Sequence, residues 1–243
     1  MKRRVDWFLR SCDARIAYED ESILVIDKPS GLLVLPDRYD RSLPNLYEGL
    51  RSELGEVFVV HRIDRETSGL LVVGKNAQSH AALSRLFEGR MVDKTYVAIS
   101  RGLSARPDGE IRVPVPVRKD GSVVEKDSES RYRVLEAFRG HSLVEVKPVT
   151  GRTHQIRLHL ASIGLPIVAD ALHGDGRPFY LSDIKASYRP GAEGERPLLA
   201  RTALHAAELR FVHPLSAQAL VFRSELPKDM RSVIRALRKY SPL

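Results

Sequence analysis

The segment HRIDRETSGLLVV, residues 61–73, decides how the chain can fold. Its second part, residues 70–73, is a run of large aliphatic and β-branched residues that is typical of a buried strand. Its first part is a polar loop that ends in turn chemistry at Thr67, Ser68 and Gly69. The pattern therefore predicts that ionisable side chains of this loop are anchored at the rim of the hydrophobic core.

Comparable segments lie on both sides of this stretch. β-Branched content or alternation predicts strands at residues 23–26, 95–99, 111–117, 132–138, 143–146, 206–212 and 219–222. Helical periodicity predicts helices at residues 43–54, 77–87, 153–163 and 229–240. Strands outnumber helices and do not alternate with them, so a βαβ series is disfavoured. We expect an α+β fold with a mixed, largely antiparallel central sheet and flanking helices.

Composition limits the classes of protein that fit. The chain has 243 residues, of which 43% are hydrophobic, enough for one sizeable core. Cys12 is the single cysteine, so an internal disulfide and a cysteine-based zinc site are excluded. Neither a signal-peptide core nor an apolar run of about 18 residues occurs. We expect a single domain over residues 1–243, with its core at about 16–226, in the cytoplasm.

The net charge of +8 favours a polyanionic partner without identifying one. Part of the excess is local, because residues 223–239 carry six cations against Glu225 and Asp229: Arg223, Lys228, Arg231, Arg235, Arg238 and Lys239. For the basic C-terminal helix at 229–240 taken alone, a solvated face is the simpler interpretation.

Asp64 is the candidate acid of the 61–69 loop. Arginines at positions 62 and 65 favour its ionised form if they lie close. An ionised carboxylate can act as a nucleophile or general base. From the spacing alone, the simpler interpretation is a capping aspartate that holds backbone N–H groups of the following turn.

A second polar stretch, TGRTHQIRLH, occupies residues 150–159. His154 and Arg157 are three residues apart on one helical face, which suits either an anion site or a wet polar face. A zinc site formed by His154 and His159 is excluded, because five residues place them about 140° apart around a helix. Tyr96, on a strand, would by itself indicate packing. Neither a phosphate-binding glycine loop nor a nucleophile elbow occurs, so no motif requires a cofactor.

Taken together, five motifs in order resemble the RluA-type RNA pseudouridine synthases. They are VIDKPSGL at 25–32, HRIDRETSGLL at 61–71 with Lys75, KTY at 94–96, TGRTHQIRLH at 150–159 with GLPI at 164–167 and Asp170, and a closing segment at 201–214. The resemblance covers residues 16–226. It implies the pseudouridine synthase catalytic fold and an enzyme that breaks the N-glycosidic bond of a uridine, rotates the uracil and rejoins it through C5.

The resemblance also implies roles for individual residues. Asp64 would be the essential carboxylate, Arg157 its ion-pair partner, and Tyr96 the ring that stacks on the uracil. Contact with RNA or the base is implied for a further five residues: His61, Arg62, Thr67, His154 and Ile167. No metal and no cofactor is implied, and the partner would be ribosomal or transfer RNA. We expect a monomer that lacks the separate upstream RNA-binding domain of many relatives.

The chain departs from the family pattern at three places. Ile63 stands where leucine is usual, Val168-Ala169 replaces a pairing with glycine, and the excursion at 173–199 is longer than compact members need. The main alternative is a non-catalytic RNA-binding or ribosome-assembly factor that keeps only the fold. A nuclease or glycosidase is a more distant alternative, because it would need a second positioned acid or histidine.

Overall fold

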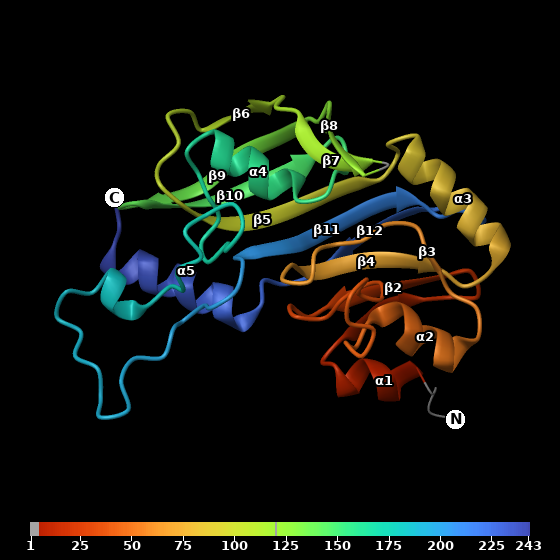
Figure 1. The fold of residues 1–243 in the computed structure, drawn as a ribbon, viewed down its shortest axis with the longest axis horizontal. Coiled ribbons are helices and arrows are strands. Elements are labelled where there is room, and N and C mark those ends of the chain that lie inside the picture. Colours follow the sequence, from red (N-terminus) through yellow and green to blue (C-terminus); the bar gives the residue numbers. More distant parts are fainter. Residues whose placement is uncertain (1–4, 120) are drawn as a thin grey trace. The chain divides into compact units, whose positions relative to one another are not determined.

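A computed structural model describes residues 5–119 and 121–243, which fall into two compact units (Figure 1). The first unit is formed by the described part of Met1–Lys94 together with Ala206–Glu225, and the second by Thr95–His205 together with Leu226–Leu243 as far as they are described. Both β5 (Asp93–Arg101) and β11 (Leu204–Val212) begin in one unit and continue in the other. Two of the three divisions therefore fall within strands, and the third lies between β12 and α5.

The first unit is built on a sheet with strand order β1-β2-β4-β11, to which β12 adds on β11 and β3 on β4. Its remaining strands and its helices are β1 (Arg15–Glu19), β2 (Ile23–Lys28), β3 (Phe58–Val59), β4 (Ser68–Gly74), β12 (Ala219–Arg223), α1 (Val5–Ser11), α2 (Leu46–Leu54) and α3 (Ala77–Glu88). Asn45 and Asn76 cap α2 and α3 by accepting backbone N–H bonds with their side chains.

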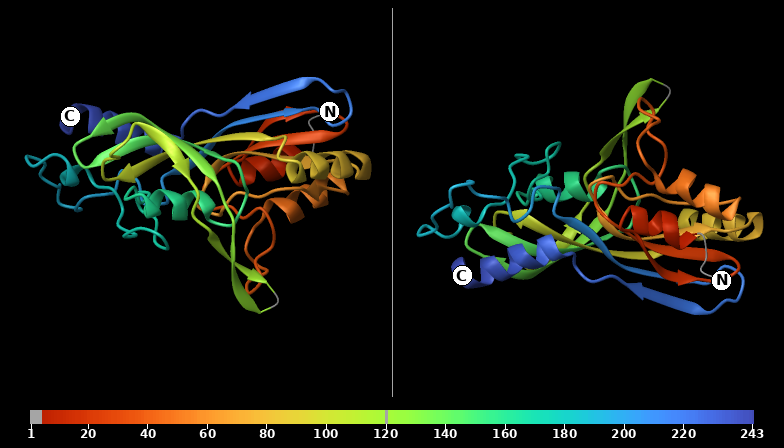
Figure 2. Two further views of the ribbon diagram at one scale, coloured as in Figure 1. Left: turned by 90° about the horizontal axis from the view of Figure 1, so that it is seen from above. Right: turned by 90° about the horizontal axis from the view of Figure 1, so that it is seen from below.

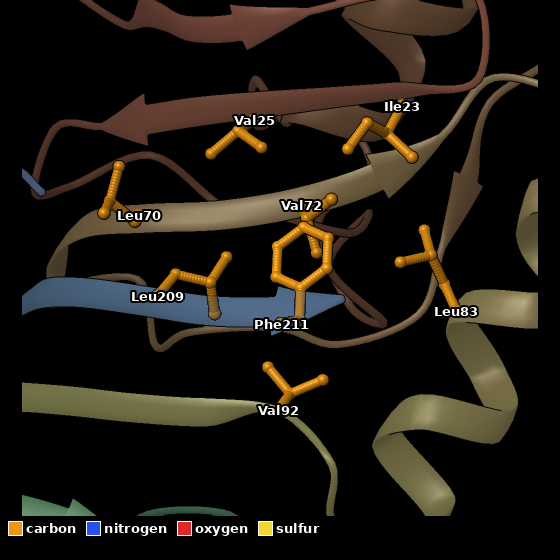
Figure 3. Packing of buried hydrophobic residues seen from close by; sticks show 8 residues of the cluster. All are labelled: Ile23, Val25, Leu70, Val72, Leu83, Val92, Leu209 and Phe211. Atoms are coloured by element: carbon orange, nitrogen blue, oxygen red, sulfur yellow. The ribbon is translucent and has the colours of Figure 1, made fainter. Parts of the chain in front are cut away.

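The core of this unit explains why residues 61–73 matter to the fold. Val25 of β2 pairs in register with Val72 of β4, and both are buried. Figure 3 shows the packed cluster, which contains Ile23, Val25, Leu70, Val72, Leu83, Val92, Leu209 and Phe211. Because β4 is fully buried, the loop that precedes it is attached at its C-terminal end to a rigid strand.

The second unit is built on antiparallel strands in the order β5-β10-β9-β6. Its elements besides β5 are β6 (Asp108–Ile111), β7 (Val115–Lys119), β8 (Ser122–Lys126), β9 (Ser130–Phe138), β10 (His141–Pro148), α4 (Gln155–Ser162), a 3-10 turn at Leu181–Asp183 and α5 (Lys228–Tyr240). In both views of Figure 2, α4 and α5 lie on opposite faces of these strands. The ribbon of β7 and β8 pairs only with itself and extends away from them.

The fold class expected from the sequence is confirmed, because eight ladders are antiparallel, β4 and β11 point the same way (Figure 1), and helices flank the strands. The segment at 111–117, expected to be an edge or irregular strand because of its two prolines, is not one continuous strand. The chain leaves β6 at Ile111 and enters β7 at Val115, and Pro114 between them has no N–H group with which to continue a ladder. The elements that were not expected are α1, β1, β3, β8 and the 3-10 turn at Leu181–Asp183.

The excursion at 173–199 is anchored in the hydrophobic interior at Phe179. Phe179 is fully buried, pairs with Leu199 through its backbone and contacts the His141 ring edge-on. No helix in the described ranges is long and apolar enough to cross a membrane.

Candidate active site

Asp64 lies in the loop between β3 and β4 of the first unit and is half-buried. The neighbouring Ile63 is 6% exposed and anchors the loop in the core. The Thr67 N–H donates to the Asp64 carbonyl oxygen at 3.1 Å, which closes a turn over the acid. The side chain of Asp64 is thus carried by a short, well-ordered turn directly before a buried strand.

The turn after β2 is hydrogen-bonded to the loop that carries Asp64 and holds that loop in place. Lys28 is 1% exposed, and its ammonium donates to the carbonyl oxygens of Pro29 and Leu32, both at 2.8 Å, and of Arg65, at 3.1 Å. A buried lysine is unusual, and these acceptors compensate for the lost hydration of its charge.

Two further bonds join the same turn to the loop. Gly31 N–H donates to the Arg65 carbonyl at 2.8 Å, and Ser30 Oγ donates to the Glu66 carbonyl at 2.8 Å. The segment at 25–32 therefore acts as a brace for the two residues that follow Asp64.

Gly69 permits the close approach of two strands beside the loop. Its φ of +110° lies in a region that other residues rarely adopt, and a Cβ there would lie 2.2 Å from the backbone oxygen of Ala206. No side chain fits, because the obstacle is backbone. Glycine is therefore required where β4 begins.

Replacing Gly69 with alanine should cost at least about 2 kcal/mol of unfolding free energy, because backbone strain and overlap with Ala206 add together. Urea denaturation measures the loss. Gly55→Ala is the matched control, since Gly55 also has a positive φ (+84°) but nothing within 4 Å of the new Cβ. Equal losses in the two variants would contradict the proposed close approach.

His61 is a structural acceptor within the first unit. Its Nε2 accepts the Val72 N–H at 3.0 Å, and its ring stacks on Phe87 with centroids 4.4 Å apart. Desolvation, with a smaller contribution from the charge of Lys94, lowers the pKa of His61 to about 3. The imidazole is thus neutral at physiological pH and holds the loop to β4.

We expect His61 not to titrate between about pH 5 and pH 8 when its ring signals are followed by NMR. The folded-state pKa is below the ordinary value of 6.5, so the unfolded chain takes up the proton first. Unfolding free energy should therefore fall as the pH drops from about 6.5 towards 3, and His61→Phe should flatten this dependence. A titration midpoint near 6.5 would contradict the assignment.

In the second unit, Arg157 on α4 forms a buried bidentate pair with Asp170. Arg157 Nε donates to Oδ2 at 2.7 Å and Nη2 donates to Oδ1 at 2.6 Å, with side chains 6% and 0% exposed. The backbone N–H groups of Leu172 and His173 also donate to Asp170 Oδ1. Burial alone would raise the pKa of Asp170, but the Arg157 and N–H bonds hold it below its usual range.

His154 and His173 make a second link across the same turn. His154 Nδ1 lies 3.0 Å from His173 Nε2, and the rings meet edge to face. His154 has a left-handed φ of +56°, so α4 begins at Gln155, two residues later than periodicity predicts. α4 is therefore joined to the segment after it through both residues 154 and 157.

A buried network on the far turn of α4 holds the base of the β7–β8 ribbon. His159 Nε2 lies 2.9 Å from the Val113 carbonyl and 2.8 Å from Ser128 Oγ, and Nδ1 lies 3.0 Å from Ser130 Oγ. Since a carbonyl only accepts, Nε2 carries the proton and Nδ1 accepts from Ser130. Desolvation lowers the pKa of His159, which favours this neutral form.

The other predicted site residues differ in accessibility. Tyr96 lies on β5 opposite Val146 and is half-buried, and Arg62 is exposed. Thr67 is 2% exposed, and Ile167 is 1% exposed with its backbone bridged to Ser100. These two side chains pack in the interior, so we now expect them to support the site rather than to touch RNA.

The predicted residues divide between the two units. Asp64, His61, Arg62 and Thr67 belong to the first, whereas the second contains the remaining four: Tyr96, His154, Arg157 and Ile167. In the described ranges, no group of three or more His, Cys, Asp and Glu side chains is arranged to hold a metal ion.

Sequence reasoning missed the partners of these residues. It placed Lys28 and Asp170 in motifs but predicted neither the bracing ammonium nor the Arg157–Asp170 pair. The one available signal was the combination of GLPI at 164–167 with Asp170, which indicates that the chain doubles back on α4.

The chain is similar to known proteins over most of its length. A family model described as RNA pseudouridylate synthase matches residues 22–162. The chain is 37% identical over 245 residues to ribosomal large subunit pseudouridine synthase D of Pseudomonas aeruginosa, with 96% of this chain and 75% of that protein covered.

A second relative and a solved structure are also similar to the chain over most of its length. The protein of the same name from Nitrosomonas europaea is 35% identical over 235 residues, with 92% of this chain covered, and the chain spans only 65% of its length. Human RNA pseudouridylate synthase domain containing 4 has the same fold, with a TM-score of 0.73 at 22% identity, covering 96% of this chain and 95% of that one.

Proposed function

This chain belongs to the RNA pseudouridylate synthase family, of the RluA type, and we propose that it converts uridine in RNA to pseudouridine with Asp64 as its essential carboxylate. The observation that carries the residue assignment is the placement of Asp64 on a turn braced by Lys28, Ser30 and Gly31. A reacting group must be held in place by surroundings that do not move during the reaction.

The proposed reaction is an isomerisation in which atoms and electrons balance internally. The C1′–N1 bond breaks, the uracil turns over, and a C1′–C5 bond forms. C5 then loses its proton while N1 gains one, so no oxidant, reductant or acceptor is consumed. We therefore propose that neither metal nor cofactor takes part.

Asp64 has two possible roles in this sequence. Its carboxylate either attacks C1′ of the ribose or removes the C2′ proton to give a glycal. Both roles need an ionised acid. Deuterium at C2′ separates them, because only the glycal route breaks that bond and slows with the heavier isotope.

We propose that Arg157 supplies a fixed positive charge and that Tyr96 stacks on the uracil near C5. Asp170 binds Nε and Nη2 of Arg157 and so fixes the plane of the guanidinium. Tyr96 combines a half-buried ring with a polar hydroxyl, which suits a flat base. His61 and His154 would then support the site by hydrogen bonds rather than carry protons.

The names of the bacterial relatives favour ribosomal RNA of the large subunit as the substrate, and we propose it for this chain. The target uridine must leave its stack, at a cost of about a few kcal/mol, before its sugar can reach Asp64. The exposed Arg62, two residues before Asp64, is suited to contact phosphates beside the vacated position. Such an enzyme would act in the cytoplasm, where that RNA is assembled.

The proposal is tested by incubating the purified protein with transcripts of large-subunit ribosomal RNA and, in parallel, of transfer RNA, followed by mapping of pseudouridine at single-nucleotide resolution. Conversion of defined uridines in the ribosomal transcript is the expected result. RNA binding without conversion in either transcript would instead support the non-catalytic alternative.

A further inference from the structure

The segment between β2 and α2 contains a closed loop at residues 35–44, which we call the 35–44 loop. Two backbone bonds join its ends: the Leu46 N–H donates to the Leu33 carbonyl at 2.9 Å, and the Tyr47 N–H donates to the Val34 carbonyl at 3.0 Å. Compact loops whose ends lie close together are frequently functional. The 35–44 loop is thus held firmly at its base.

The base of the 35–44 loop adjoins the turn that braces Asp64. Leu32, directly before the joined residues, accepts a bond from the Lys28 ammonium, which also donates to the Arg65 carbonyl. Within the loop, backbone N–H bonds hold the pKa of Asp37 below its ordinary value, and the charge of Arg65 adds to this effect. The 35–44 loop therefore lies beside the loop of Asp64, within the first unit.

Tyr39 lies on a tight turn of the 35–44 loop. The carboxylate of Asp37 accepts the N–H groups of Tyr39 and Asp40, at 2.8 and 3.0 Å. Asp40 in turn accepts the N–H group of Ser42 at 3.0 Å. Two consecutive aspartate-capped turns thus fix the backbone around Tyr39, so little further ordering of this backbone is needed when a ligand binds.

The side chain of Tyr39 is 95% exposed. Among the large hydrophobic side chains that the structure describes as exposed, Tyr39 is the one aromatic, and the next most exposed, Leu243, reaches 72%. Its neighbours Arg38 and Arg41 are exposed as well. Aromatic rings and guanidinium planes are the groups on which unpaired RNA bases stack. The turn therefore presents the side-chain types that suit a nucleobase.

We propose that Tyr39 stacks on an unpaired base of the RNA substrate, beside the uridine that reaches Asp64. The inference rests on the proposed function and names a base-binding residue for it that is distinct from Tyr96. An aromatic ring accepts any base, because every base has a π-face, so this contact would add affinity without reading sequence. Tyr39 and Asp64 belong to the same unit, which would then hold both the target sugar and a neighbouring base.

The test measures the affinity of Tyr39→Ala, Tyr39→Leu, Tyr39→Phe and the wild-type protein for a hairpin of large-subunit ribosomal RNA with an unpaired loop. The alanine and leucine variants should bind about 5- to 100-fold more weakly, whereas the phenylalanine variant keeps the ring and should stay within about twofold. The slope of log affinity against log salt should not change, because no phosphate contact is lost. Turnover at saturating RNA should stay within a few-fold of the wild-type rate.

Two controls separate stacking from general effects. Leu103→Ala removes another exposed apolar side chain, 50% exposed and outside the 35–44 loop, and should leave the affinity unaltered. When a complementary strand closes the unpaired RNA loop, the wild-type protein and Tyr39→Ala should bind equally, because paired bases are not free to stack on the ring. The urea midpoint of Tyr39→Ala should match that of the wild-type protein, since the ring is exposed.

Unchanged affinity in Tyr39→Ala, or an equal loss in Leu103→Ala, would overturn the proposal. Retained affinity in Tyr39→Leu would also overturn it in favour of a simple apolar contact, and a full loss in Tyr39→Phe would do so in favour of a hydrogen bond from the hydroxyl. The proposed function fails separately, if RNA binding depends on Tyr39 as expected but the wild-type protein forms no pseudouridine.

Discussion

Replacing Asp64 with asparagine should lower pseudouridine formation by about 10⁴-fold or more and change RNA affinity by no more than a few-fold. Asparagine has nearly the shape of aspartate, but it is neither a nucleophile nor a base at neutral pH. The turn itself should persist, because Thr67 N–H closes it through the Asp64 backbone carbonyl. Turnover is measured at saturating RNA, and affinity by titration of the same RNA.

Glu66→Gln is the matched control, because it removes a negative charge two residues away in the same loop. It should leave turnover within a few-fold of the wild-type rate. Asp64→Ala repeats the test with a residue that cannot deamidate back to the acid. Retained turnover in both Asp64 variants would remove this carboxylate from the chemistry, whereas loss in the Glu66 variant alone would move the role to Glu66.

Replacing Asp170 with alanine should cost about 3–5 kcal/mol of unfolding free energy, because the Arg157 guanidinium is left buried without its carboxylate. Urea denaturation measures the loss. Glu193→Ala breaks a pair of similar length, 3.0 Å, with Arg196, but those side chains are 83% and 88% exposed. That control should lose no more than about 1 kcal/mol, and an equal loss in the two variants would contradict the special role of burial.

Two further measurements separate stability from catalysis at this pair. The double variant Arg157→Met/Asp170→Leu should recover much of the stability, because no uncompensated charge is left, but it should not recover turnover. The lowered pKa of Asp170 also fixes the sign of the pH effect. Its stabilisation should be complete above about pH 4 and lost as the pH falls through the folded-state pKa.

The elements that the sequence predicted best are those in which the local propensity of the residues matches their tertiary environment. β4 lies where the apolar run at 70–73 indicates, because β-branched side chains suit a strand buried on both faces. The hairpin of β9 and β10 turns at Gly140, whose φ of +75° few other residues adopt. Local propensity and tertiary packing favour the same structure at both places.

The interactions that hold the site could not be read from local pattern. Lys28 follows a strand and precedes Pro29, which indicates a turn, yet nothing in that pattern places its ammonium 3.1 Å from the Arg65 carbonyl, 37 residues away. Asp170 pairs with Arg157 because the chain reverses after α4, and the direction of that reversal depends on the packing of Leu165 and Ile167. Such pairings are long-range, whereas sequence periodicity reports only on neighbours.

Helix α5 shows, on the surface, the same difference between what local pattern predicts and what tertiary contacts decide. Periodicity predicted the helix within one residue of its observed start, and the charge count predicted a basic face. The engagement of Arg223 by Glu208 and of Arg238 by Glu136 depends on tertiary neighbours, so these ion pairs could not be read from the charge count.

The most direct test of the central claim is the mapping of pseudouridine in total RNA from cells with the gene deleted, complemented either by the wild-type protein or by Asp64→Asn. The account predicts that at least one ribosomal site loses pseudouridine on deletion, regains it with the wild-type protein and does not regain it with Asp64→Asn. An unchanged map on deletion, or full restoration by Asp64→Asn, would contradict the claim that this chain isomerises uridine through Asp64.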